Sequence, residues 1–380
     1  MPGAWLGLLG GGQLGRMFCM AAQSLGYNVI VLDPSPESPA GSVADRHLVA
    51  DYLDHDALAT LRGLCQGATT EFENVPSAAL EFLARTIRVT PGAASVAIAQ
   101  DRISEKTFVS GHRFPVAPFM VLRTRADLKR MPQDLLPGIV KSARLGYDGK
   151  GQVRVGTRDD VAHALATMQG KPCVLERLVD LQAELSVIVA RDDQANLCAW
   201  PVAENLHRNG ILDTSIVPAR VDPVLAGEAR TIATALATAL DYRGVLCVEF
   251  FVAPGGELLV NEIAPRPHNS GHYTIDACVT SQFEQQARVL AGMPMGDTLQ
   301  HTPAVMLNLL GDLWFAGPES GAREPDWARV LAHPQAKLHL YGKREPRRGR
   351  KMGHVTCLGA TLDEALATSL AIRRELRMPA

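Results

Sequence analysis

The stretch GLLGGGQLGRMFCMAAQSLGYNVIVLDP, residues 7–34, constrains the possible fold more than any other part of the chain. An apolar run leads into glycines, an amphipathic run over 13–25 predicts a helix, and the apolar run 27–32 predicts a second buried strand. Strand, helix and strand in so few residues predict a βαβ unit, whose strands are parallel. Strand patterns at 47–50 and 67–70 then alternate with helical patterns at 54–64 and 77–85. We therefore expect a doubly wound, Rossmann-like α/β sheet over residues 1–99.

The glycines of this stretch allow two interpretations. Gly10, Gly12 and Gly15 have the spacing G-x-G-x-x-G, and Asp33 follows where a ribose-binding acid would stand. In the first interpretation, a dinucleotide pyrophosphate binds the backbone N–H groups at the start of the helix. In the second, the glycines only let strand, turn and helix pack closely. The loop by itself does not decide between a dinucleotide site and a structural turn.

The composition excludes several classes of function. With 380 residues the chain is too long for one ordinary core, so we expect two or three domains. A net charge of −2 and 5% aromatic residues argue against nucleic-acid and membrane-surface partners. The seven cysteines are scattered without a C-x-x-C pair, which predicts free thiols in the cytoplasm. No apolar stretch approaches the roughly 20 residues of a membrane span, and no Cys or His cluster has the spacing of a zinc site.

The lengths and the order of the strand and helix patterns change at residue 101. Short strand patterns at 119–122, 138–141, 152–155 and 173–176, with helical patterns at 125–130 and 159–168, predict a small α+β lid. Longer strand patterns follow at 183–190, 197–201, 245–252 and 257–263, with a helical pattern at 226–240. From residue 303 short strands surround a basic loop, and a helical pattern at 362–377 ends the chain.

The stretch CVEFFVAPGGELLVNEIAPRPHNSGH, residues 247–272, predicts a β-hairpin that carries chemistry. Gly255 and Gly256 suit a two-residue turn with positive φ. Cross-strand partners then have residue numbers that sum to 511, so Glu249 lies opposite Glu262 and Phe250 opposite Asn261. Two opposed carboxylates on an apolar sheet are destabilising unless a cation lies between them, which predicts Mg²⁺ bound with substrate phosphates. The alternative is a register slipped by one, with Glu249 facing solvent.

Two further loops could hold a nucleotide. Lys141 ends a strand pattern, and a loop with Gly146, Gly149 and Gly151 follows, whose backbone amides could cover phosphates; it is not a Walker A loop. The alternative is an ordinary hairpin with glycine turns. Carboxylates at strand ends, Glu176 and Glu184, suit recognition of an amine or a ribose hydroxyl, although such groups are often merely solvated.

The order of these motifs resembles that of the ATP-grasp superfamily and, within it, the N5-carboxyaminoimidazole ribonucleotide synthetase family. The matching stretches run nearly end to end: GGGQLGRM (10–17), EFENVP (71–76), QDRISEK (100–106), GYDGKGQ (146–152), NLHRNGIL (205–212), NEIAPRPHNSGH (261–272) and YGKREPRRGRKMGHV (341–355). The resemblance implies a mixed α/β and α+β fold. Its parts are a Rossmann-like pre-ATP-grasp domain over 1–99, an ATP-grasp domain over 100–300 with its lid at about 117–176, and a small β-rich C-terminal domain over 301–380.

The resemblance also implies the activity. Such proteins use ATP and bicarbonate to carboxylate the exocyclic amine of 5-aminoimidazole ribonucleotide through carboxyphosphate, in de novo purine biosynthesis. They use Mg²⁺ and neither NAD nor biotin, and they are homodimers. Their glycine loop faces the ribonucleotide rather than a dinucleotide.

Site residues follow from the resemblance, position by position. ATP contacts are implied at Arg102, Lys141, Gly146, Tyr147, Asp148, Gly149, Lys150, Gly151, Gln152, Glu176, Arg177, Leu178, Val179, Glu184, His207, Asn261 and Glu262. Ribonucleotide contacts are implied at Gln13, Leu14, Glu73, Tyr147, Asp148, Arg266, His268, Asn269, Ser270, Lys343 and Arg350. Catalytic roles fall on Tyr147, Asp148, Arg266, His268 and Lys343, and magnesium ligation on Glu249 and Glu262.

Several alternatives stay open from the sequence. Leu145, where relatives often have glycine, and Arg344 beside Lys343 are small departures from the family pattern. The basic run 343–351 could be simply solvated, and His268 and His272 could be ordinary core or surface histidines. Rival functions are another ATP-grasp ligase, such as a formate-dependent glycinamide ribonucleotide transformylase or a biotin carboxylase-like enzyme, an NAD-dependent oxidoreductase, and a non-catalytic nucleotide sensor.

Overall fold

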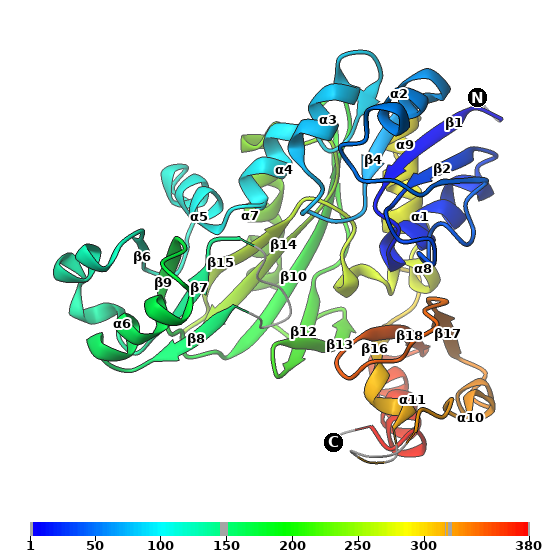
Figure 1. Ribbon diagram of the computed structural model, residues 1–380. Helices are drawn as coiled ribbons and strands as arrows, with labels where there is room; N and C mark the ends of the chain where they lie inside the picture. The colour runs from blue at the N-terminus through cyan, green and yellow to red at the C-terminus, as the bar shows by residue number, and fades with distance from the viewer. Residues whose placement is uncertain (1–2, 145–150, 316, 318–320, 379–380) are drawn as a thin grey trace.

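The computed structural model describes residues 3–144, 151–315, 317 and 321–378. Three β-sheets with helices on their faces form an N-terminal part, a projecting lid and a large central sheet that runs on into the C-terminal part (Figure 1). The predicted mixture of α/β and α+β structure is confirmed. Among the helices of the described residues, none combines the length and the apolar character needed to cross a bilayer.

The N-terminal part contains a five-stranded parallel sheet, as predicted, with the order β3-β2-β1-β4-β5. Its strands are β1 (Trp5–Leu9), β2 (Asn28–Leu32), β3 (Arg46–Leu48), β4 (Cys65–Thr70) and β5 (Arg88–Val89). Its helices are α1 (Gln13–Ser24), α2 (His55–Leu64), α3 (Ser77–Ala84) and α4 (Ala93–Ala99). One face of the sheet packs against α2, α3 and α4, and the other packs against α1.

A helix from much later in the chain completes the second face. In α9 (Gln282–Ala291), the side chains of Phe283, Ala287 and Leu290 join the apolar cluster under α1 (Figure 1). The sequence patterns did not predict α9, because its buried positions include glutamines. Gln286 donates to Thr69 at 2.7 Å and accepts from the backbone N–H of Val245 at 2.6 Å, so it bonds the N-terminal sheet to the central one.

The lid is a four-stranded antiparallel sheet with the order β6-β9-β7-β8. Its elements are β6 (Phe119–Leu122), β7 (Gly138–Ser142), β8 (Gln152–Val155), α6 (Arg158–Thr167) and β9 (Cys173–Arg177), and α5 (Arg102–Gly111) precedes it. The predicted helix at 125–130 is a 3₁₀ helix, Arg125–Arg130. Pro132 follows two residues later, which leaves too little chain for a regular α-helix.

The central sheet is antiparallel and has the order β15-β14-β10-β12-β13-β16-β18-β17, with β11 beside β10. Its strands are β10 (Ala183–Arg191), β11 (Leu197–Ala199), β12 (Ala203–Arg208), β13 (Ile211–Val217), β14 (Gly244–Ala253), β15 (Glu257–Ala264), β16 (Ala304–Leu310), β17 (Ala336–Leu340) and β18 (Lys351–Leu358). The accompanying helices are α7 (Pro223–Ala239), α8 (Thr274–Ala277), α10 (Trp327–Leu331) and α11 (Leu362–Glu375). The domain limits at 99 and 300 stay predictions.

Strands β12 and β13 were not predicted, although their turn carries a strong signal. Arg208 pairs with Ile211, so the turn consists of Asn209 and Gly210 alone. Both have positive φ, 51° and 77°, as a type I′ turn requires. The Asn-Gly pair between NLHR and ILDT is therefore a hairpin signal in the sequence.

The glycine loop before α1 is filled by the chain's own carboxylates. The backbone N–H groups of Gly12 and Gly15 donate to the two carboxylate oxygens of Glu71 at 2.6 and 3.0 Å. The N–H of Gly11 donates to Asp33 at 2.7 Å, and Tyr52 donates to the same oxygen at 2.8 Å. The anion that a helix N-terminus attracts is thus an internal side chain. These contacts favour the structural interpretation of the loop over the dinucleotide one.

Replacement of Gly12 by alanine tests this arrangement. A Cβ at Gly12 would collide with Glu71 Oε1 and lie 2.8 Å from Glu71 Oε2, so we expect Gly12→Ala to destabilise the protein by about 1–3 kcal/mol. The control is Gly63→Ala in α2, where a Cβ meets nothing within 4 Å and should stabilise by about 0.5–1 kcal/mol. Urea denaturation followed by circular dichroism measures both; equal midpoints for the two variants would contradict the prediction.

Candidate active site

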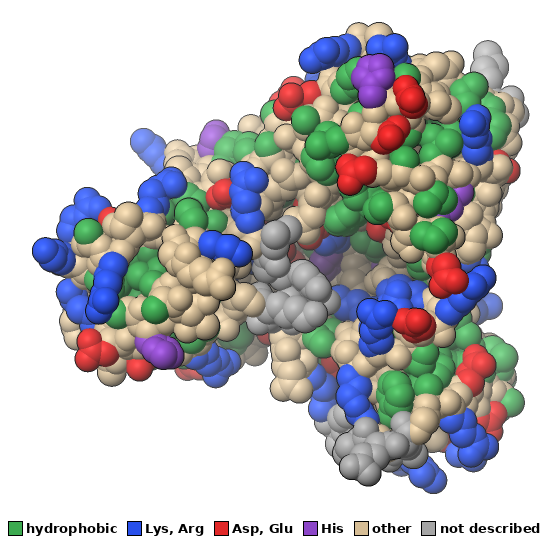
Figure 2. Space-filling model, viewed as in Figure 1, with side chains coloured by type: hydrophobic (Ala, Val, Ile, Leu, Met, Phe, Trp, Pro, Cys, Tyr) green, Lys and Arg blue, Asp and Glu red, His purple; other side chains and the backbone are tan. Residues whose placement is uncertain are grey.

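One cleft of about 700 Å³ gathers most of the predicted site residues. It lies between the lid, the central sheet and the N-terminal part, and Figure 2 shows Lys and Arg side chains around the hollow above the C-terminal part. The predicted residues that line it are Gln13, Leu14, Glu73, Arg102, Lys141, Gln152, Glu184, His207, Glu249, Asn261, Glu262, Arg266, His268 and Asn269.

The β14–β15 hairpin places Glu249 opposite Glu262, as predicted. The predicted pairing of Phe250 with Asn261 is wrong, because Phe250 pairs with Val260 and a β-bulge follows. The turn contains three residues rather than two, since Ala253 pairs with Glu257. This shifts the register by one residue, and the bulge shifts it back. A bulge also lets neighbouring residues face one side, and both Asn261 and Glu262 line the cleft.

The electrostatics of this carboxylate pair favour a cation. Burial and the nearby charge of Glu262 raise the pKa of Glu249 to about 7. The side chain of Glu249 is 17% exposed and that of Glu262 is 43% exposed, and both line the cleft. Carboxylate and amide oxygens are the ligands that Mg²⁺ takes in proteins, and Asn261 stands beside the pair. The donor set fits a divalent cation held together with phosphate oxygens.

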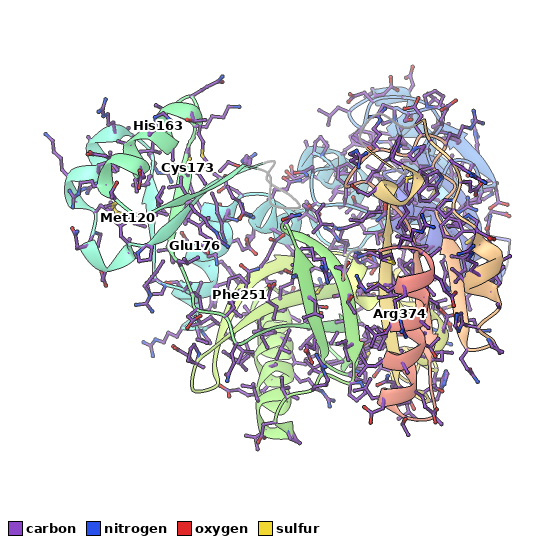
Figure 3. All side chains as sticks on the ribbon, turned by 90° about the horizontal axis from the view of Figure 1, so that it is seen from below. Met120, His163, Cys173, Glu176, Phe251 and Arg374 are labelled. Carbon is purple, nitrogen blue, oxygen red and sulfur yellow. The ribbon has the colours of Figure 1, made fainter. Side chains whose placement is uncertain are left out.

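The floor of the lid carries a buried charge cluster. Lys141 on β7 donates to Glu176 on β9 at 2.9 Å, and the ammonium group of Lys106 on α5 lies 3.3 Å from the same oxygen. Burial alone would raise the pKa of Glu176, but the two ammonium groups outweigh it and hold that pKa at about 2. Figure 3 shows Glu176 on the lid and Phe251 across from it on the central sheet. Burial lowers the pKa of Lys141 and the carboxylate of Glu176 opposes that shift, so Lys141 reaches the cleft paired with Glu176.

Two more ion pairs stand on the central-sheet side. The Nδ1 atom of His207 lies 2.7 Å from Glu184 Oε2. Burial alone would lower the pKa of His207, but the carboxylates of Glu184 and Glu249 raise it. The guanidinium group of Arg102 lies 3.6 Å from Glu262 and donates to the backbone oxygen of Ser142 at 3.2 Å. Arg102 therefore connects the carboxylate pair to the lid.

The far end of the cleft connects the N-terminal and C-terminal parts. Arg266 donates to Glu73 at 2.6 Å, and this guanidinium outweighs burial to lower the pKa of Glu73. Lys343 donates to the side-chain oxygen of Gln13 in the glycine loop and to the backbone oxygen of Lys351 at 2.6 Å. The basic segment is therefore bonded to the start of α1.

Some predicted residues lie elsewhere. Arg177 ends β9, and Leu178 and Val179 follow it in the connection from the lid to β10. Lys343 and Arg350 are not among the residues of the cleft wall. Glu176 and Ser270 are buried behind residues of the wall. Gly151 precedes β8 with a φ of 70°. The predicted Gly146, Tyr147, Asp148, Gly149 and Lys150 lie outside the described residues, as does Leu145.

The two histidines left open by the sequence have different surroundings. His268 lines the cleft, whereas His272 is buried against the rings of Phe283 and His354. Burial lowers the pKa values of both well below the ordinary value, so both rings are neutral. His354 also stacks on His339, which pairs with Asp276 at 2.8 Å. The stacked rings are only 12° from parallel, so their in-plane lone pairs do not meet at one metal position.

The cleft wall also contains residues that the sequence analysis missed: Ile139, Arg154, Leu181, Asn209, Gly210, Leu212, Phe251 and Lys351. Phe251 stands two positions after Glu249 on β14, so strand periodicity could have found it. Lys351 lies inside a quoted motif but begins β18, and only the pairing of that strand decides which neighbour faces the cleft.

Comparison with known proteins agrees with this geometry. The chain matches family models described as ribonucleotide synthetase preATP-grasp domain (residues 4–100), ATP-grasp domain (107–283) and phosphoribosylaminoimidazole carboxylase C-terminal domain (304–368). It is 47% identical over 358 residues to N5-carboxyaminoimidazole ribonucleotide synthase from Brucella melitensis, covering 93% of this chain and 96% of the relative. Among solved structures, the ADP complex of an N5-carboxyaminoimidazole ribonucleotide synthetase has a TM-score of 0.90 at 39% identity, covering 98% and 97% of the two chains. The Aspergillus clavatus synthase in complex with ADP and 5-aminoimidazole ribonucleotide has a TM-score of 0.89 at 30% identity, covering 100% of both.

Replacement of Glu176 by glutamine tests the charge cluster. It would leave the buried ammonium groups of Lys106 and Lys141 without a counter-charge, so we expect a destabilisation of about 3–5 kcal/mol near neutral pH. The wild-type advantage should be fully present above the ordinary glutamate pKa of 4.5 and disappear as the pH falls through about 2. The control, Glu345→Gln, removes an exposed partner of Arg347 and should leave the urea midpoint unchanged. A midpoint for Glu176→Gln equal to that of the control would refute the cluster's role.

Proposed function

The chain belongs to the N5-carboxyaminoimidazole ribonucleotide synthase family of ATP-grasp ligases, and from that premise we propose how its cleft works. The protein is an ATP-dependent ligase that carboxylates 5-aminoimidazole ribonucleotide in purine biosynthesis. We propose that bicarbonate supplies the carboxyl group and that carboxyphosphate is the intermediate. This proposal rests on one observation: the carboxylates of Glu249 and Glu262 lie opposite each other and line the same cleft as residues of the lid and of the N-terminal part.

We propose that ATP lies between the lid and the central sheet. Lys141 and Arg102 supply positive charge for the phosphates from the lid side, and Glu184 with His207 stands on the sheet side for the ribose. The backbone over 176–179 joins the lid to β10 and would contact the adenine base of ATP. The loop 146–151 is proposed to contact the phosphates.

We propose Glu249, Asn261 and Glu262 as the residues that hold Mg²⁺ with the ATP phosphates. When bound, the cation would neutralise phosphate charge and so ease nucleophilic attack at phosphorus. Arg102 contacts Glu262 and His268 contacts Glu249, at 3.6 and 3.2 Å, so each carboxylate is oriented by a neighbour on a different element.

The chemistry we propose has two steps. An oxygen of bicarbonate attacks the γ-phosphorus of ATP, the bond from that phosphorus to the bridging oxygen breaks, and ADP leaves. The amine nitrogen then bonds to the carboxyl carbon, the carbon–oxygen bond to phosphate breaks, and the nitrogen loses a proton. Arg266 and His268 would stabilise the negative charge that develops on phosphate and carboxylate, and Asp148 would accept or position the amine proton. Exclusion of water protects carboxyphosphate from hydrolysis.

We propose that the ribonucleotide lies toward the N-terminal part. Arg266, His268 and Asn269 line that end of the cleft with Gln13, Leu14 and Glu73. Lys343 and Arg350 would bind its phosphate from the basic segment, and Tyr147 and Ser270 would complete the pocket. Glu71 and Asp33 accept the hydrogen bonds of the backbone amides in the glycine loop, so those amides are not open to a dinucleotide. This supports a ribonucleotide beside the loop.

All seven cysteines are free thiols, which supports a cytoplasmic location; the homodimer stays a prediction.

An isotope experiment tests the source of the carboxyl group. With ¹⁸O-labelled bicarbonate and Mg-ATP, attack at phosphorus transfers one labelled oxygen to the phosphate that is released. We expect ADP release to depend strongly on added aminoimidazole ribonucleotide and the phosphate to carry one ¹⁸O. Label-free phosphate would overturn the carboxyphosphate step, and ADP release indifferent to the ribonucleotide would overturn the proposed coupling of the two substrates.

A pair of variants tests the cation ligands. We expect Glu262→Gln to lower the rate of ADP release by at least about 10²-fold, because an amide replaces a charged oxygen ligand. Glu257→Gln changes an exposed glutamate at the turn end of the same strand and should keep the wild-type rate. Circular dichroism confirms that both variants fold. A folded Glu262→Gln variant with wild-type turnover would remove Glu262 from the metal site.

A further inference from the structure

A row of buried polar side chains crosses the central sheet toward the cleft. Ser215 on β13 donates to the side-chain oxygen of Asn205 on β12 at 2.7 Å. The amide nitrogen of Asn205 donates to Ser186 on β10 at 2.9 Å, and Ser186 donates to Ser270 at 2.7 Å. All four residues are at most 3% exposed. None of Ser186, Asn205 and Ser215 lines the cleft. Their hydrogen bonds therefore affect the cleft only through the residue at the end of the row.

That residue is His268. The hydroxyl of Ser270 lies 2.9 Å from His268 Nδ1. On the other side of the ring, His268 Nε2 lies 3.2 Å from Glu249 Oε1. The row therefore connects the middle of the sheet to one of the two carboxylates that face each other in the cleft.

The orientation of the Asn205 amide sets the direction of the bonds in the row. Its nitrogen faces Ser186 and can only donate, so the oxygen of Ser186 accepts from it. Ser186 then gives its one proton to Ser270. The hydroxyl of Ser270 also contacts Cys247, but an imidazole nitrogen is a stronger acceptor than a thiol, so Ser270 donates to His268 Nδ1. The backbone N–H of Ser270 points at the same nitrogen at 3.4 Å, so both donors favour a lone pair on Nδ1.

A ring with a lone pair on Nδ1 carries its proton on Nε2, the nitrogen that faces Glu249. In this tautomer an N–H group holds one carboxylate oxygen and leaves the other free. In the opposite tautomer the lone pair of Nε2 would face the ionised carboxylate of Glu249 across 3.2 Å and push the two side chains apart.

We propose that Asn205 is a positioning residue for the carboxylation reaction: through Ser186 and Ser270 it fixes the tautomer of His268 that holds Glu249. The role of Glu249 rests on the proposed function, but the tautomer does not. The side-chain partners of metal-ligating groups typically change metal affinity or activity by about 10- to 100-fold when removed. Asn205 acts two hydroxyl groups further away along an unbroken row.

The substitution Asn205→Asp reverses the row with little change of shape. An aspartate still accepts from Ser215 but cannot donate, so Ser186 donates to it and the hydroxyl of Ser270 donates to Ser186. The Ser270 oxygen, 2.9 Å from His268 Nδ1, then accepts from that nitrogen, and only the longer 3.4 Å contact from the Ser270 backbone N–H still favours a lone pair there. The matched control is Asn308→Asp on β16 of the same sheet. Asn308 is 1% exposed and its amide donates to the backbone oxygen of Leu212 at 2.7 Å, outside the row.

The side-chain ¹⁵N resonances of histidine-labelled protein report the tautomer without substrate, with His268→Gln giving the assignment. We expect the Nε2–H form in the wild type and in Asn308→Asp. We expect the Nδ1–H form in Asn205→Asp, with kcat reduced about 10- to 100-fold and the KM for ATP unchanged. An Nδ1–H form in the wild type, or a folded Asn205→Asp variant with wild-type resonances or kcat, would overturn the proposal.

A second variant keeps the test decisive if Asn205→Asp does not fold. Ser215→Ala removes the hydroxyl that holds the side-chain oxygen of Asn205, so the amide can rotate and both tautomers of His268 should be populated. A single Nε2–H form in Ser215→Ala would overturn the proposal. The two proposals can fail separately. If the released phosphate carries no ¹⁸O but the tautomers are as expected, the proposed chemistry is refuted and the role of Asn205 in fixing the ring stands.

Discussion

The face-to-face placement of Glu249 and Glu262 is the constraint around which the cleft is arranged. Like charges on paired strands repel, and burial adds a desolvation cost, so the folded chain must hold them in place. The backbone ladder of β14 and β15 fixes their separation. Arg102 from α5 and His268 from the loop after β15 each contact one of them. Three elements thus converge on this pair, and the contacts from Arg102 and His268 offset part of its repulsion.

The sequence predicted this pair correctly although its assumed register is not continuous. Summing residue numbers to 511 treats the hairpin as an unbroken ladder with a two-residue turn. The actual turn has three residues and the bulge before Asn261 restores the offset, so two departures cancel at the glutamates and not at Phe250. Bulges depend on how two strands fit together, and a single strand's pattern does not contain that information.

Buried polar residues limited the prediction in other places. Helix α9 has buried glutamines, among them Gln286, whose partners Thr69 and Val245 are far away in the chain. These polar residues conceal the amphipathic pattern of the helix. The glycine spacing 10–15 was recognised, yet it does not say whether the anion it binds is a ligand or the chain's own Glu71. Lys141 and Glu184 lie near the end of one strand and the start of another, both with clear apolar patterns, and both residues line the cleft; their contact with ATP stays a prediction. Lys351 was missed because the choice between it and Arg350 depends on the pairing of β18.

The central sheet connects the two ends of the cleft through one backbone ladder. Glu249 on β14 and Lys351 on β18 belong to one antiparallel ladder whose strands are joined by backbone hydrogen bonds throughout. Among the described residues, the lid strands form a separate sheet and add no strand to that ladder. A change in the position of the lid would therefore leave the spacing between Glu249 and Lys351 unchanged, because one sheet holds both.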